Sequence, residues 1–166
     1  MKRMRWILPI ALAAVLLGAI SFYTRPMTLS QLCPAMDVTE SEAVSGYYSA
    51  APGAEDEYFE ITEEDARFGQ ILALFENRKF RRSPVSLLPQ GAKVHSPQEG
   101  DFQWEILFHI SDAKLPDGST VSGTPLRIHN FYGTLEVCFN GEVWQCTTAD
   151  KDQWLKDVMQ RISSVG

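Results

Sequence analysis

Residues 102–110 alternate between apolar and polar side chains. Trp104, Ile106 and Phe108, with Phe102 and Ile110 at the two ends, fall on one face, and the other face is mostly polar. Because successive side chains of a β-strand point to opposite faces of the sheet, this period of two predicts a strand with one buried face. The pattern is typical of a sheet that is covered on one side only.

A β-hairpin is predicted for residues 134–139 and 142–147, which flank the dipeptide Asn140-Gly141. Asn-Gly favours a two-residue type I′ turn, and this turn fixes the register of the two strands. Val137 then lies opposite Trp144, and Leu135 lies opposite Cys146, so the apolar side chains share one face. Cys138 falls on the other face, beside Val143, and we expect no disulfide between Cys138 and Cys146.

The remaining elements are predicted from periodicity and turn residues. Strands are expected at residues 43–50, 57–61, 80–83 and 126–131, and long loops at 87–101 and 111–123. A helix is expected over 62–77, with Thr62 as its N-cap and three acidic residues in its first turn. A second amphipathic helix follows residue 150, and its apolar stripe consists of Trp154, Leu155, Val158, Met159 and Ile162.

The order of strands, helix, strands and helix, with short turns between neighbouring strands, predicts an α+β fold. We expect a two-layer sandwich with a mainly antiparallel sheet and two helices on one face. Residues 1–23 would form a transmembrane or signal helix, 24–42 a linker, and 43–166 a single domain.

The N-terminus resembles a membrane-targeting segment. Lys2, Arg3 and Arg5 precede an uncharged run of 18 residues, 6–23. At about 1.5 Å per residue this run extends roughly 27 Å as a helix, close to the ~30 Å hydrocarbon core of a bilayer. The basic flank should stay in the cytoplasm, so we expect a single-pass protein of the cell membrane with an extracytoplasmic C-terminal domain.

Cleavage and lipidation are alternatives to an uncleaved signal-anchor. The small-residue pattern Ala19-Ile20-Ser21 could be a signal-peptidase site, in which case the protein would be secreted. The bulky pair Phe22-Tyr23 follows directly and suits a membrane interface better than a cleavage site. Ser30-Gln31-Leu32 before Cys33 is a poor match to a lipoprotein signal.

The charge after residue 23 is strongly negative. Twelve of the 15 basic residues and all 21 acidic residues lie there, which gives a net charge of −9. This balance argues against nucleic-acid partners and against adhesion to anionic lipid headgroups. The three cysteines cannot all pair within one chain, and the sequence leaves open whether Cys33 pairs with Cys138.

No motif predicts a catalytic, cofactor-binding or metal-binding site. The histidines His95, His109 and His129 lack metal-ligand spacing, and the sequence contains no nucleophile motif and no phosphate-binding glycine loop. We therefore expect solvated histidines, no cofactor and no enzymatic activity. Cys146 is expected on a core face, where a thiol behaves as a small hydrophobic group.

One basic cluster stands out in the acidic domain: Arg78, Lys79, Arg81 and Arg82. These residues could complement the C-terminus of the preceding helix or bind an acidic partner. The sequence favours a non-catalytic binding or accessory module, anchored in the membrane, whose partner is an unknown protein or envelope component. The alternatives are an exported small hydrolase or inhibitor-like module that uses the long loops, and a structural subunit of a membrane complex.

Overall fold

A computed structural model describes residues 4–49, 55–87, 103–131 and 134–163. The helices are α1 (Met4–Tyr23), α2 (Leu29–Leu32), α3 (Phe68–Glu76) and α4 (Lys151–Ser163), with short 3₁₀ helices η1 (Val38–Glu40) and η2 (Pro84–Leu87). The strands are β1 (Pro26–Met27), β2 (Ala43–Ser49), β3 (Glu57–Thr62), β4 (Phe80–Arg82), β5 (Gln103–His109), β6 (Asp112–Lys114), β7 (Thr120–Ser122), β8 (Leu126–Phe131), β9 (Thr134–Phe139) and β10 (Glu142–Thr148). The predicted α+β class with a mainly antiparallel sheet is confirmed, and the sheet is large.

Eight of these strands form the main sheet, in the order β1-β4-β10-β9-β8-β5-β2-β3, and all its neighbours are antiparallel. The β9–β10 hairpin has the predicted register, with Val137 opposite Trp144 and Leu135 opposite Cys146. Asn140 and Gly141 both have positive φ, as a type I′ turn requires. The segment 111–123, expected as a loop, contains the separate β6–β7 hairpin. Most of the other expected loop, 87–101, lies outside the described residues.

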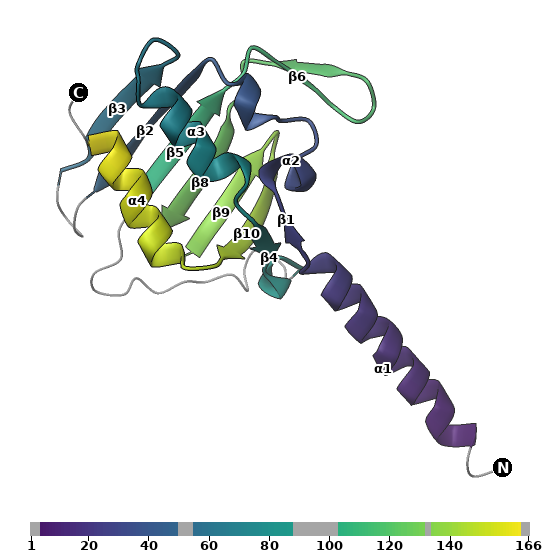
Figure 1. The fold of residues 1–166 in the computed structure, drawn as a ribbon. Coiled ribbons are helices and arrows are strands. Elements are labelled where there is room, and N and C mark those ends of the chain that lie inside the picture. The colour runs from purple at the N-terminus through teal and green to yellow at the C-terminus, as the bar shows by residue number, and fades with distance from the viewer. Residues whose placement is uncertain (1–3, 50–54, 88–102, 132–133, 164–166) are drawn as a thin grey trace.

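Helices α3 and α4 lie side by side on one face of the main sheet (Figure 1). Trp154 of α4 is the centre of the core, because its ring meets those of Phe75, Phe80 and Trp104 edge-on at centroid distances of 5.1, 5.8 and 6.2 Å. Its indole nitrogen donates to the carbonyl of Leu74 at 3.1 Å, which satisfies the polar end of a ring that is otherwise buried. The two helices are therefore held to the sheet by aromatic packing.

Helix α3 begins later than its sequence suggests. Instead of continuing a helix from Thr62, residues 63–67 form turns, and α3 starts at Phe68. The reason is a local polar contact, since the carboxylate of Asp65 accepts hydrogen bonds from the backbone and guanidinium of Arg67, the shortest at 2.6 Å. Short acidic side chains that bind nearby backbone compete with helix formation in this way.

The segment expected as a linker contributes to the core. Residues 24–42 contain β1, α2 and η1, and six of their hydrophobic side chains are buried in the core: Met27, Leu29, Leu32, Cys33, Met36 and Val38. Strand β1 pairs with β4 at the edge of the main sheet. Thr28 caps α2 through a capping box with Gln31. The domain that folds as a unit therefore begins almost directly after α1.

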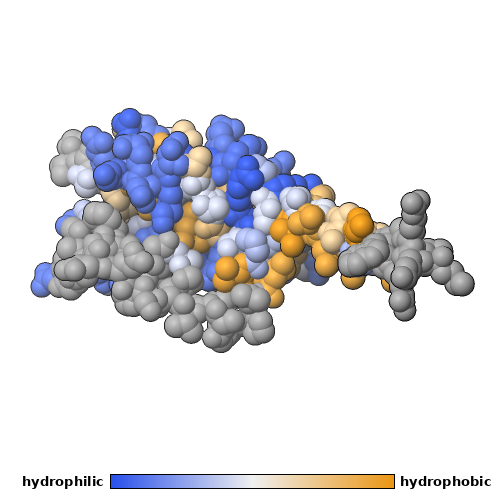
Figure 2. Space-filling view, turned by 90° about the horizontal axis from the view of Figure 1, so that it is seen from below, coloured by the Kyte–Doolittle hydropathy of each residue, from blue (hydrophilic) through white to orange (hydrophobic). Residues whose placement is uncertain are grey.

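Helix α1 projects away from the domain (Figure 1). Of its described side chains, Leu8, Val15, Leu17 and Phe22 are between 65 and 77% exposed. Seen from below, the coloured surface is mostly hydrophobic near this helix and mostly hydrophilic at the opposite end of the molecule (Figure 2). Among the described residues, no helix combines the length and apolarity needed to span a membrane. The transmembrane assignment thus stays a prediction.

Candidate functional site

The sheet face opposite α3 and α4, here called the outer face, carries a row of polar side chains that crosses six strands. Antiparallel register places one residue of each strand beside its neighbour. The row is Tyr58, Tyr47, Glu105, His129, Glu136 and Gln145, from β3, β2, β5, β8, β9 and β10. These side chains come from distant parts of the sequence, and only the strand pairing brings them together.

His129 lies between two carboxylates of this row. Its Nε2 is hydrogen-bonded to Oε2 of Glu136 at 2.8 Å, and its Nδ1 lies 3.7 Å from Oε2 of Glu105. The side chain is buried, with 8% of the residue exposed. The expectation of solvated histidines is therefore wrong for His129. Of the other two, His109 is half-buried and hydrogen-bonded to Ser45 at 2.7 Å, and His95 lies outside the described residues.

Both carboxylates that flank His129 have further partners. Oε2 of Glu105 lies 3.4 Å from Nε of Arg127, and Oε1 of Glu136 accepts a hydrogen bond from the Gln145 amide at 3.1 Å. The backbone of Gln145 is bonded in turn to the Ser86 hydroxyl, which accepts from its N–H and donates to its carbonyl. The arrangement holds the carboxylates in fixed orientations around the imidazole.

Cys138 completes a group of three potential metal ligands with His129 and Glu136. One ligand atom from each residue lies within 4.8 Å of the other two. Burial raises the pKa of the Cys138 thiol to about 11, and the carboxylate of Glu136 adds to this effect, whereas Arg127 opposes it. The thiol is therefore protonated at neutral pH when no metal is bound. The sequence predicts no metal site, because its histidines lack metal-ligand spacing along the chain, and it is the strand pairing that brings these three potential ligands together.

The spacing of β8 and β9 contains a signal for this cluster. Only two residues separate Phe131 from Thr134, and a two-residue connection pairs these positions directly. Counting back from that pair places His129 opposite Glu136, with Cys138 two positions further along the same face. Motif searches along the chain miss such a site because its ligands are joined across a sheet.

A hollow of about 570 Å³ lies on the outer face next to this cluster. Tyr47 and Tyr58, with ring centroids 5.9 Å apart, form part of its wall, and Glu105 is shared between the hollow and the environment of His129. At its floor β2 approaches β5 very closely, since a Cβ on Gly46 would lie 1.9 Å from the Glu105 carbonyl oxygen. Only glycine fits this position without moving a strand.

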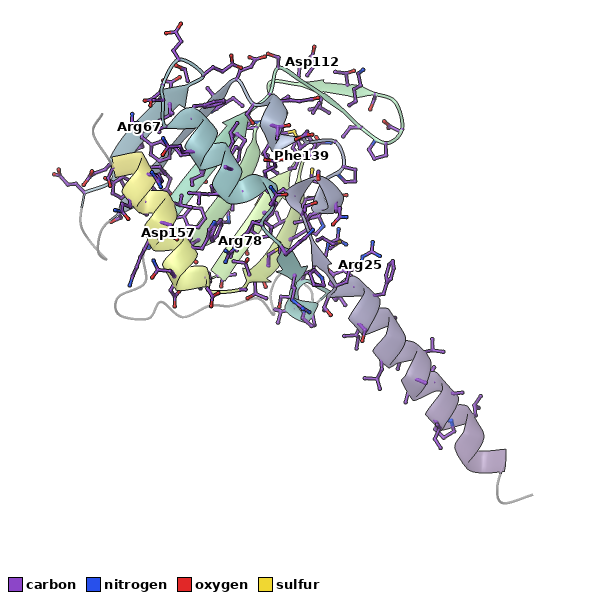
Figure 3. All side chains as sticks on the ribbon, viewed as in Figure 1. Arg25, Arg67, Arg78, Asp112, Phe139 and Asp157 are labelled. Atoms are coloured by element: carbon purple, nitrogen blue, oxygen red, sulfur yellow. The ribbon has the colours of Figure 1, made fainter. Side chains whose placement is uncertain are left out.

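The predicted basic cluster is divided between packing and surface. Arg78 lies between α4 and the sheet (Figure 3), with its guanidinium 5.1 Å from the Trp154 ring and its Nε donating to Thr148 at 2.7 Å. Arg82 is half-buried and lies over the rings of Tyr23 and Trp144 at 5.4 and 5.7 Å. The remaining two members of the cluster, Lys79 and Arg81, are exposed.

A second hollow, of about 540 Å³, lies where α1 joins the domain. We call it the basic hollow, and its lining residues are Thr24, Arg81, Arg82, Ser83, Pro84, Val85, Thr134, Gln145, Cys146, Thr147 and Lys151. Three cationic side chains thus gather at the end of an acidic domain from which α1 emerges.

All three cysteines lie within the described residues and are free thiols. Cys33 therefore does not pair with Cys138. Cys146 is buried on the helix-covered face, as predicted, and burial raises its pKa to about 12. Burial likewise raises the pKa of Cys33 to about 11. The fold is maintained without disulfide bonds.

Comparisons with protein-family models, with curated proteins and with solved structures found no match to this chain.

Proposed function

We propose that this chain is a membrane-tethered, extracytoplasmic domain that acts by binding a protein or envelope component and performs no catalysis of its own. The observation that carries the proposal is the position of the basic hollow directly beside the exit of an exposed apolar helix. A tether and a candidate binding surface then lie at the same end of the molecule.

Helix α1 has the surface of a tether. Its apolar side chains are exposed, and their transfer from water to an apolar environment lowers the free energy. The uncharged sequence 6–23 and the basic residues before it favour a single pass through the cell membrane with the domain outside. Removal of this segment at residues 19–21 would instead yield a secreted domain.

The basic hollow suits an acidic partner. The region after residue 23 carries a net charge of −9, so a concentration of Arg81, Arg82 and Lys151 is an exception on its surface. Arg82 is occupied with two aromatic rings, whereas Arg81 is exposed. We therefore assign the main contact with a partner to Arg81.

The tether is tested by intact-mass measurement of the protein recovered from membranes after alkaline carbonate extraction. We expect the mass of a chain that still begins at Met1, because the apolar helix stays in the bilayer. A mature N-terminus near Phe22, or release of the uncleaved chain by carbonate, would contradict the tether.

The binding surface is tested by crosslinking in intact cells, followed by recovery of partners with the wild-type chain and with the variant Arg81→Glu. The matched control is Lys156→Glu, which reverses a similarly exposed charge on α4. We expect Arg81→Glu alone to lose the partner, and added salt to weaken wild-type binding, because exposed charges are screened over about 10 Å at 0.1 M. Equal recovery with both variants would contradict the assignment.

A further inference from the structure

We infer that His129, Glu136 and Cys138 form a site for a divalent transition-metal ion, with Zn²⁺ as the best fit. The inference rests on the geometry of the outer face and is independent of the proposed tether and partner. The three ligand atoms already lie within 4.8 Å of one another, on two adjacent antiparallel strands. Metal–ligand distances of about 2.0–2.3 Å at tetrahedral angles place ligand atoms about 3.3–3.8 Å apart, so side-chain movements of up to about 1 Å are needed.

The donor set selects the class of metal. A thiol, an imidazole and a carboxylate together offer sulfur, nitrogen and oxygen, a combination that Zn²⁺ accepts in proteins. Ca²⁺ and Mg²⁺ require oxygen ligands and would leave the thiol and the imidazole unused. Three protein ligands leave one tetrahedral position for a water molecule or for a group from a partner.

The residues around the ligands match what a metal site needs in its second layer. When Nε2 of His129 faces the metal, Nδ1 faces Oε2 of Glu105 at 3.7 Å, and a movement of this carboxylate into hydrogen-bonding distance would orient the metal-binding imidazole. The Gln145 amide donates to Oε1 of Glu136 and leaves Oε2 directed at His129. Both supports lie in the same polar row that crosses the sheet.

The charges around His129 also favour a cation. Two carboxylates, Glu105 and Glu136, flank the imidazole. The guanidinium of Arg127, on β8 opposite Cys138, lies against Glu105 and is half exposed to solvent. A bound divalent ion would therefore compensate carboxylate charge that is partly removed from water.

The test is titration of the full-length chain, in detergent and after treatment with a chelator, with Co²⁺ as a spectroscopic substitute for Zn²⁺. We expect one ion per chain, with a thiolate-to-cobalt charge-transfer band and the intense visible bands of tetrahedral Co²⁺, both removed by added Zn²⁺. Cys138→Ser should lose the charge-transfer band, and Glu136→Gln should weaken binding at least tenfold. Cys146→Ser, which removes a thiol from the other face, should leave both unchanged.

A measurement on the wild-type chain does not depend on whether the variants fold. Zn²⁺ should slow alkylation of Cys138 at least tenfold and leave the rates at Cys33 and Cys146 unchanged, as read by mass spectrometry of the labelled peptides. The inference is overturned by an unchanged alkylation rate at Cys138, by absence of Co²⁺ binding, or by a charge-transfer band that persists in folded Cys138→Ser.

Discussion

Arg81 and Arg82 are neighbours in sequence with different surroundings. They are successive residues of β4, so their side chains point to opposite faces of the sheet. Arg82 covers the rings of Tyr23 and Trp144 and reaches the Leu32 carbonyl at 3.4 Å, which links α1, α2 and β10. Arg81 is exposed and lines the basic hollow. A basic cluster that looks uniform in sequence thus contains two kinds of residue.

This difference predicts unequal effects on stability. Arg82→Ala should lower the free energy of unfolding by about 1–2 kcal/mol, because it removes two cation–π contacts and a backbone hydrogen bond. Arg81→Ala should stay within about 0.5 kcal/mol of the wild type, as surface substitutions usually do. Urea denaturation of the two variants measures both values. A loss for Arg82→Ala no greater than that for Arg81→Ala would contradict this prediction.

Among the structural elements, the start of α3 and the end of α4 are joined through Arg67, which also forms an ion pair with Asp65. Arg67 binds the carboxylate of Asp65 at 2.6 Å and donates to the carbonyl of Ile162, in the last turn of α4, at 2.8 Å. One side chain therefore joins the start of one helix to the end of the other. The Arg67 guanidinium and backbone N–H lower the pKa of Asp65 from 3.8 to about 2.

The sign of this shift predicts a loss of stability in acid. A lowered pKa means that the folded state prefers the ionised carboxylate, so the contribution is complete above about pH 4 and is lost as the pH falls through about 2. We expect the melting temperature of the wild type to fall more steeply between pH 4 and 2 than that of Asp65→Asn, which has no charge to lose. Parallel curves for the two proteins would contradict the ion pair.

Two tryptophans, Trp154 of α4 and Trp144 of β10, differ in burial and should differ in their contribution to stability. Trp154 is 3% exposed and contacts three other rings, so Trp154→Ala should cost about 3–5 kcal/mol. Trp144 is only partly buried, beneath Arg82, and its replacement by alanine should cost less, about 1–2 kcal/mol. Denaturant unfolding of the two variants decides the order. The reverse order would place the centre of the core at β10.

Local patterns in the sequence predict many of these elements but not their neighbours in space. The alternation around Trp104 and the Asn140-Gly141 turn are local, and both β5 and the β9–β10 hairpin are found where expected. The insertion of β4 between β1 and β10 joins segments far apart in the chain, and no local pattern records it. The predicted helix start at Thr62 is wrong, and the helix begins at Phe68, because the side chain of Asp65 competes with an apparent N-cap. The cluster around His129 was recoverable from strand register alone.

For the whole molecule, the folded unit begins close to residue 24. Met27, Leu29, Leu32, Met36 and Val38 are each at most 4% exposed and belong to the same core as the main sheet. Their hydrophobic contribution is comparable to the entire stability of a domain, since each large-to-small change at such sites costs about 2–5 kcal/mol and domains are stable by about 5–15 kcal/mol.

This predicts opposite results for two truncations. A chain that starts at Thr24 should unfold cooperatively, with a free energy of unfolding close to that of the full chain. A chain that starts at Ala43 should lack a cooperative transition, because it loses all five of these buried side chains. Circular dichroism during urea unfolding distinguishes the two outcomes. A stable fold from Ala43 onward would restore residues 24–42 to the role of a linker.

The short connection between α1 and β1 has a mechanical consequence. Only Thr24 and Arg25 separate the helix from a two-residue strand at the edge of the sheet. Tension applied through α1 would act first on that strand, whose few hydrogen bonds should break before those between the long central strands. In a single-molecule pulling experiment we expect detachment of residues 24–42 to precede rupture of the remaining sheet. The segment that joins α1 to the sheet would then unfold under load while the outer face of the sheet stays folded.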